Sequence, residues 1–108
     1  MLRIPQSCIH TRSTPFWNKD TAPAGIFLRH LDQGTRPGVY PRLSVSRGDV
    51  RYLGYADEFA LTPDSELIIQ AGHFSVFPPE KWHRIELIAD DTLFNVDFFV
   101  EPDVLRSL

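Results

Sequence analysis

Prolines and glycines punctuate this sequence at short intervals, and no stretch between them keeps a sustained helical period. The chain has nine prolines and six glycines among 108 residues. Proline cannot donate the backbone hydrogen bond that a helix interior needs, and glycine weakens a helix. Short apolar stretches bounded by turn residues are typical of β-strands. The punctuation therefore predicts an all-β chain built from many short strands.

The predicted strands cover residues 25–31, 39–47, 50–55, 67–70, 73–77, 82–89 and 92–100. Because side chains alternate along a strand, Ile26, Leu28 and His30 are expected to share one face. A tight turn is expected at Gly48. Residues 1–24 are expected to form an extended arm, residues 56–65 a surface loop, and residues 101–108 a tail with one helical turn after Pro102. Short strands at this spacing predict a sandwich or a barrel in one domain of residues 1–108.

Composition excludes several classes of function. The net charge is −3 and no basic run exists, so no nucleic-acid partner is expected. No apolar run approaches the roughly 18 residues of a membrane span, so no membrane partner is expected either. The single cysteine, Cys8, excludes an internal disulfide and a thiolate metal cluster. The N-terminus lacks the apolar core of a signal peptide, which favours a cytoplasmic location.

One segment narrows the fold further. Residues 72–83 read GHFSVFPPEKWH, and in them Gly72, Pro78 and His83 keep the spacing of the second cupin motif. Glu80 stands where that motif has its second glycine. Residues 42–50 resemble the closing strand–glycine–strand part of the first cupin motif, but its paired histidines are missing and Pro41 stands at its glutamate position. The resemblance implies a cupin-type barrel, also called a double-stranded β-helix or jelly roll.

The resemblance to a known family covers nearly the whole chain. Residues 9–17 (IHTRSTPFW), 38–45 (GVYPRLSV) and 78–83 (PPEKWH) resemble the small stand-alone cupins called YeaR-like, which are related to the N-terminal domain of the tellurite-resistance protein TehB. This implies a role in tellurite or oxyanion stress. The longer relatives carry a methyltransferase domain that uses S-adenosylmethionine. These 108 residues hold no Gly-x-Gly-x-x-Gly pattern, so methyl transfer is not expected of this chain.

Three residues are candidate metal ligands. His30 and His83 each end an apolar strand face, and neutral imidazole is a common nitrogen ligand for zinc, iron and nickel. Asp97 lies in an otherwise apolar strand and needs a partner. A metal ion, an arginine such as Arg42 or Arg84, or a hydrogen bond to His83 would each satisfy it. A divalent metal held by His30, His83 and Asp97 would suit iron(II) and also zinc; the alternative is that both histidines are core residues.

These features leave three functions open. The first is a metal-binding or ligand-binding stress protein without turnover. The second is a metal-dependent enzyme, an oxygenase or an isomerase, acting on a small molecule at an open coordination position. The third is a structural or regulatory module in which the histidines only pack. The missing first-motif histidines favour binding over catalysis, and a homodimer is expected through the apolar strand at residues 94–100 and the arm around Trp17.

Overall fold

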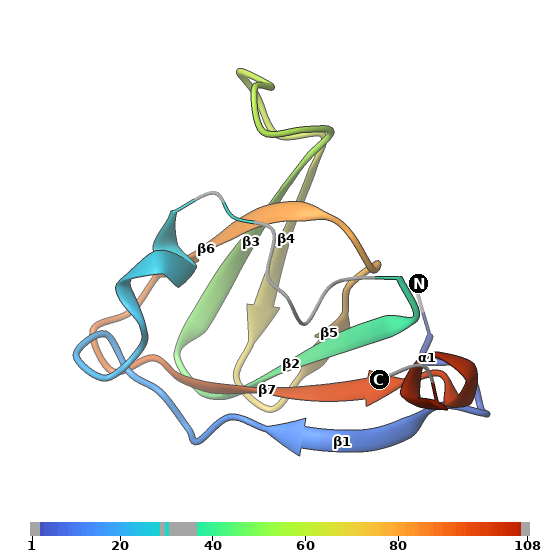
Figure 1. Ribbon diagram of the computed structural model, residues 1–108. Helices are drawn as coiled ribbons and strands as arrows, with labels where there is room; N and C mark the ends of the chain where they lie inside the picture. Colours follow the sequence, from blue (N-terminus) through green and yellow to red (C-terminus); the bar gives the residue numbers. More distant parts are fainter. Residues whose placement is uncertain (1–2, 29, 31–36, 107–108) are drawn as a thin grey trace.

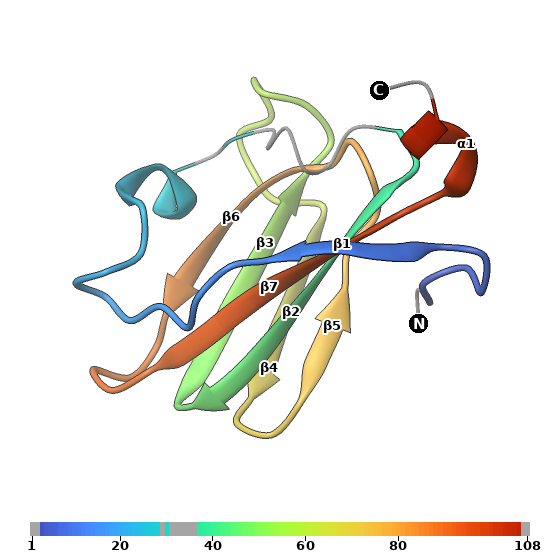
Figure 2. The same cartoon turned by 60° about the horizontal axis from the view of Figure 1, so that its bottom comes forward.

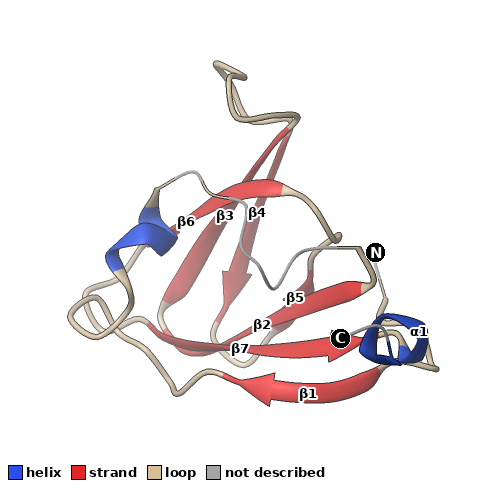
Figure 3. Cartoon of the chain, viewed as in Figure 1, coloured by secondary structure: helices blue, strands red, loops and turns tan. Residues whose placement is uncertain are grey.

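The computed structural model describes residues 3–28, 30 and 37–106. These residues form seven strands, one short 3-10 helix (η1) and one α-helix (α1), and Figure 3 marks each as strand or helix. The elements follow the order β1 (Ile9–Ser13), η1 (Ala24–Phe27), β2 (Val39–Arg47), β3 (Asp49–Tyr55), β4 (Ser65–Gln70), β5 (Phe74–Val76), β6 (Trp82–Leu87), β7 (Leu93–Val100) and α1 (Pro102–Arg106). The predicted all-β class is confirmed.

The strands form two antiparallel sheets that face each other. One sheet has the order β1-β7-β2-β5 and the other has the order β4-β3-β6 (Figure 1). The last strand, β7, therefore lies inside its sheet between the first strand and β2, as a second view also shows (Figure 2). After β2 the chain passes repeatedly from one sheet to the other.

The prediction of a closed barrel is wrong. Each sheet keeps two edge strands: β1 and β5 in the larger sheet, and β4 and β6 in the smaller one. The two sheets are not joined at these edges: among the described residues, no strand pairing links β4 to β5 or β6 to β1. The architecture is therefore an open two-sheet arrangement, and the finer cupin-type jelly roll stays a prediction.

The hydrophobic core fills the space between the two sheets. Alternate positions of β2 are buried, as expected for a strand with one face inward. The buried core residues come from both sheets and from the segment after β5: Val39, Leu43, Val45, Val50, Tyr52, Ile69, Phe77, Ile85, Phe94, Val96, Phe98 and Val100. The apolar strand at residues 94–100 was the reason for expecting a homodimer interface there. Its residues Phe94, Phe98 and Val100 are buried inside the domain, so they are not available to such an interface.

Two N-terminal predictions are wrong. The described residues of the expected strand, 25–28 and 30, do not form one: η1 starts after Pro23, whose φ of −58° begins a turn closed by a bond from Ile26 N–H to the Pro23 carbonyl. Residues 29 and 31 of the expected strand lie outside the described residues. The predicted arm contains strand β1, which pairs with β7 from Ile9 opposite Val100. All five β1 residues are exposed, so no apolar alternation marked them as a strand.

Two tight turns have the left-handed backbone that favours glycine. Gly48 has a φ of 67° and joins β2 in one sheet to β3 in the other, so the predicted turn is a corner between sheets. Glu80 has a φ of 57°, which is uncommon for a residue with a side chain. Glu80 is the residue that stands at the glycine position of the motif, and its backbone keeps the conformation that a glycine would adopt there.

The remaining outer features are a projecting loop and a short C-terminal helix. The loop between β3 and β4 extends away from both sheets (Figure 1) and carries Phe59 and Leu61, which are 80% and 96% exposed. The expected helical turn after Pro102 is α1. None of the helices in the described ranges has the length and apolar character needed to cross a membrane.

Candidate functional site

The structure brings two of the predicted ligands, His30 and His83, into direct contact. Their backbones form an isolated antiparallel bridge, in which each N–H donates to the other's carbonyl at 2.9 and 3.1 Å. Their rings lie edge to face with centroids 4.4 Å apart. His30 is therefore held beside the start of β6 by an isolated bridge and not as part of a regular strand. Both histidines border the same space between the sheets, and their role as metal ligands stays a prediction.

Short backbone contacts orient both imidazole rings. Nδ1 of His30 lies 2.8 Å from the carbonyl of Leu28, and Nδ1 of His83 lies 2.6 Å from the carbonyl of Lys81. A carbonyl can only accept, so Nδ1 carries the proton in both rings. In the neutral form the lone pair is then on Nε2, which is the nitrogen that such a ring offers to a metal or to a hydrogen-bond donor.

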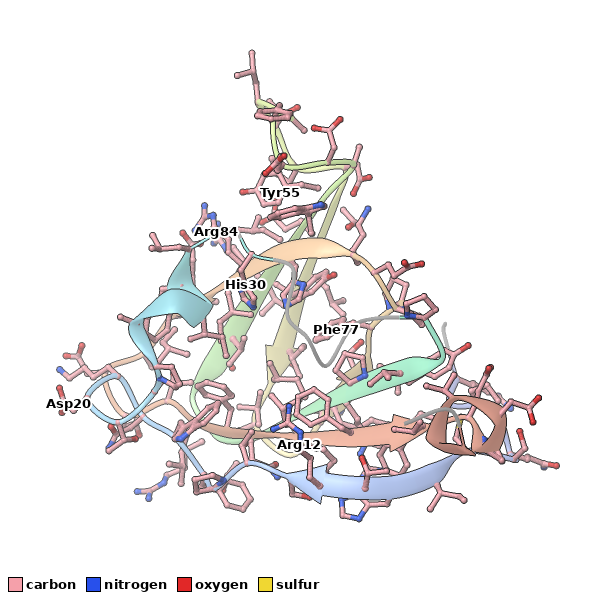
Figure 4. All side chains as sticks on the ribbon, in the orientation of Figure 1. Arg12, Asp20, His30, Tyr55, Phe77 and Arg84 are labelled. Carbon is pink, nitrogen blue, oxygen red and sulfur yellow. The ribbon has the colours of Figure 1, made fainter. Side chains whose placement is uncertain are left out.

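The histidine pair lines a partly open cavity of about 300 Å³ between the two sheets. Most of the lining is apolar, and it comes from β1, η1, β2, β6, β7 and the segments that follow β1 and β5. In Figure 4, Arg12, His30 and Phe77 reach toward this space from different parts of the chain. The lining residues are Arg12, Thr14, Trp17, Pro23, Gly25, Ile26, His30, Pro41, Leu43, Phe77, His83, Ile85, Val96 and Phe98.

An aromatic stack supports His83 from the core side. Tyr52 lies parallel to Phe77 with ring centroids 3.8 Å apart, and its other neighbour is the His83 ring at 5.7 Å. The Tyr52 hydroxyl is buried and has no hydrogen-bond partner among the described residues. Burial, together with the nearby charge of Asp64, raises the pKa of Tyr52, so this hydroxyl stays protonated. The stack fixes the His83 ring at the cavity wall.

Asp97 lies apart from the histidine pair. Its neighbours Val96 and Phe98 line the cavity, so the Asp97 side chain is on the opposite face of β7. There Arg42 donates to its carboxylate at 3.0 Å, and the Ser13 hydroxyl donates to the other oxygen. Burial tends to raise the pKa of Asp97, but the hydrogen bonds from Ser13 and Arg42 outweigh it and lower the pKa. Of the partners expected for Asp97, the structure shows the arginine.

Comparison with known proteins identifies the family. The family model described as the TehB-like domain matches residues 12–96. The chain belongs to the TehB-like domain family. The protein YeaR of Escherichia coli is 72% identical over 107 residues, which are 99% of this chain and 90% of YeaR. A crystal structure of a protein from Escherichia coli, also 72% identical, superposes with a TM-score of 0.91 and covers 94% of this chain and 99% of its own.

TehB of Haemophilus influenzae is a more distant relative. Described as a probable S-adenosyl-L-methionine-dependent methyltransferase, it is 24% identical over 98 residues, which are 85% of this chain but only 31% of TehB. Its crystal structure superposes with a TM-score of 0.76 at 25% identity and covers 89% of this chain and 32% of TehB. This chain thus corresponds to about a third of the length of that protein.

Sequence reasoning missed the cavity residues that precede η1. Arg12, Thr14 and Trp17 all line the cavity of this TehB-like domain, whereas Trp17 was expected on an outer surface. Trp17 instead pairs with Phe94 through a backbone bridge and packs edge-on against its ring. A signal was present, because all three residues lie in the segment 9–17 that carries the family resemblance. Strand alternation could not find them, since β1 is exposed along its length.

The described residues of the TehB-like domain fit a divalent metal only in part. Among them no group of three or more His, Cys, Asp and Glu side chains lies close enough to hold an ion. His30 and His83 supply two adjacent nitrogen donors with oriented rings. Zinc centres in proteins usually have at least three protein ligands, so the pair alone is not a closed structural site.

Proposed function

We propose that this TehB-like domain is a binding module that holds a small, largely apolar molecule in the cavity beside the histidine pair. The observation that carries the proposal is the cavity itself. Its volume of about 300 Å³ is at the lower end of the range of about 300–1,000 Å³ found for ligand sites. Its apolar walls and few polar groups match the usual composition of such sites.

The hydrophobic effect supports this assignment. The cavity is partly open, so its apolar walls are exposed to solvent in the free protein. Burying the apolar body of a ligand against these walls is favourable by roughly 25 cal/mol per Å² of apolar surface removed from water.

Intrinsic fluorescence tests the proposal directly. The chain has two tryptophans, and only Trp17 lines the cavity. In a Trp82→Phe background, titration with octanol as a neutral apolar probe is expected to change Trp17 emission in a saturable way. Ile26→Phe, which enlarges a lining side chain, is expected to weaken binding. Ile88→Phe, at an exposed position outside the lining, is the matched control. Absence of saturable binding in the Trp82→Phe protein would refute the proposal.

The second candidate function is divalent-metal binding, and the contact between His30 and His83 favours it. Zinc, iron or nickel would serve there as a Lewis acid that polarises the polar end of a molecule in the cavity. Cobalt or nickel titration followed by absorbance should show binding that weakens about 10-fold or more in His83→Gln and in His30→Gln. His73→Gln, an exposed histidine outside this cavity, is the control.

The pH dependence of metal binding gives a further check. A histidine must be neutral to ligate, and metal binding therefore competes with protons, so metal affinity is expected to fall as the pH is lowered. Asp97→Asn is expected to leave metal affinity unchanged, because Asp97 faces the other side of β7. Metal binding that survives both histidine substitutions would place the ion elsewhere.

The family relation suggests the wider setting of this proposal. Together with the cupin motif spacing, it supports a cupin-type jelly roll and a cytoplasmic role in tellurite or oxyanion stress, with the protein acting as a homodimer. A metal-dependent enzyme remains the alternative and requires a coordination position open to the cavity. Turnover of a small molecule that is lost in His83→Gln, with binding retained, would favour the enzyme over the binding module.

A further inference from the structure

Arg12 places a permanent positive charge at the wall of the cavity. It lies on β1, and its guanidinium carbon is 4.0 Å from the centroid of the Phe98 ring. Arg12, which is labelled in Figure 4, and Phe98 both line the cavity. A guanidinium held over an aromatic face is attracted to the ring, which restricts its motion. Arg12 is therefore in place before any ligand arrives.

The charge of Arg12 is not neutralised by the described part of the protein. Arg42, Arg51 and Arg84 each lie within 3.5 Å of a carboxylate oxygen. Arg12 has no such carboxylate among the described residues, and no described Asp or Glu belongs to the cavity lining. Arginine stays protonated at every physiological pH. Arg12 is an exposed residue at the edge of the cavity, and a guanidinium without a described carboxylate partner favours an anion there.

We infer that Arg12 selects small organic monoanions, with a carboxylate bound at the guanidinium and an apolar body in the cavity. This inference rests on the proposed binding function and names its ligand class. The planar guanidinium can donate two parallel hydrogen bonds to one carboxylate. The apolar side chains Ile26, Leu43 and Ile85 then contact the body of the ligand. An inorganic oxyanion would meet the charge but leave these walls without a partner.

The test compares an anion with its neutral counterpart. In the Trp82→Phe protein, octanoate is expected to bind about 10- to 100-fold more tightly than octanol, as one charge-assisted contact predicts. Arg12→Gln should remove this preference while octanol binding persists. Arg47→Gln changes the net charge equally at an exposed position outside the cavity and should keep the preference. Arg12→Glu should instead favour octylammonium over octanoate.

The outcomes separate this inference from the proposed function. If octanol and octanoate both bind with equal affinity, or if Arg12→Gln and Arg47→Gln weaken octanoate equally, Arg12 selects nothing and the inference is overturned. Sulfate binding as tight as octanoate binding would overturn the requirement for an apolar body. If no probe binds to a folded protein, the binding function itself fails. Arg12→Lys covers the case in which Arg12→Gln does not fold, and it should retain part of the preference.

Discussion

The corner at Gly48 allows a quantitative test of the fold. Gly48 joins the two sheets with a φ of +67°, and a Cβ added there would clash with Thr92 Oγ1 and lie 2.8 Å from Thr92 Cα. Thr92 is fully buried, and its hydroxyl donates to the Asp49 carbonyl and accepts from the Ala89 N–H, each at 3.2 Å. The Gly48→Ala substitution therefore meets both a backbone penalty and a rigid neighbour.

Substitutions at two other glycines distinguish the backbone cost from the cost of the close contact with Thr92. A left-handed backbone costs a residue with a side chain about 1–2 kcal/mol, and overpacking a buried site costs about 1–3 kcal/mol. Gly48→Ala is therefore expected to lower the free energy of unfolding by about 2–5 kcal/mol. Gly72 has a φ of +84° but open space around it, so Gly72→Ala should cost only about 1–2 kcal/mol. Gly25 has neither constraint, so Gly25→Ala should change stability by less than about 1 kcal/mol.

Urea denaturation followed by tryptophan fluorescence measures all three variants under one protocol. The order of stability should be Gly25→Ala, then Gly72→Ala, then Gly48→Ala, with unchanged dependence on urea concentration. Equal losses in Gly48→Ala and Gly72→Ala would show that Thr92 yields without cost, which would refute the argument from the buried corner. A loss of stability in Gly25→Ala as large as that in Gly72→Ala would refute the cost assigned to the left-handed backbone.

Three further predictions concern single residues. The lowered pKa of Asp97 stabilises the fold at pH values above the unfolded-state pKa of about 3.9. This contribution is lost as the pH falls through the folded-state pKa. In melting experiments at a series of pH values, the melting temperature of Asp97→Asn should therefore fall less in acid than that of the unsubstituted protein. Glu80→Gly should raise the free energy of unfolding in urea by about 0.5–1 kcal/mol, because it relieves a left-handed backbone. Tyr52→Phe should raise the melting temperature, since it removes a buried hydroxyl that lacks a described partner.

The sequence predicted the strands that have one buried face. Residues 39–47 coincide with β2, because alternate apolar side chains on a half-buried strand leave a period of two. The cupin spacing also placed His83 at the start of β6, and the left-handed Glu80 explains how the spacing holds without its glycine. Local patterns and turn chemistry were sufficient to predict a strand wherever one side of it faces the core.

The parts that could not be predicted depend on contacts between distant segments. Strand β1 is exposed throughout, so only its pairing with β7 defines it. His30 reaches His83 through a single bridge after a 3-10 turn, and the position of Arg12 over Phe98 depends on the β1–β7 register. For Asp97 the sequence could not decide between a metal and an arginine, since both satisfy a carboxylate and only the opposite neighbour on β2 selects Arg42.

The strand order β1-β7-β2 has a consequence for how the protein is made. β7 is the in-sheet neighbour of both β1 and β2, so β1 has no strand to pair with until the end of the chain has been synthesised. Arg12 is carried by β1, and the Phe98 ring beneath it is carried by β7. The cavity wall that they form is thus completed only after translation has passed β7, and a nascent chain halted before residue 93 would expose an unfinished sheet to chaperones and proteases.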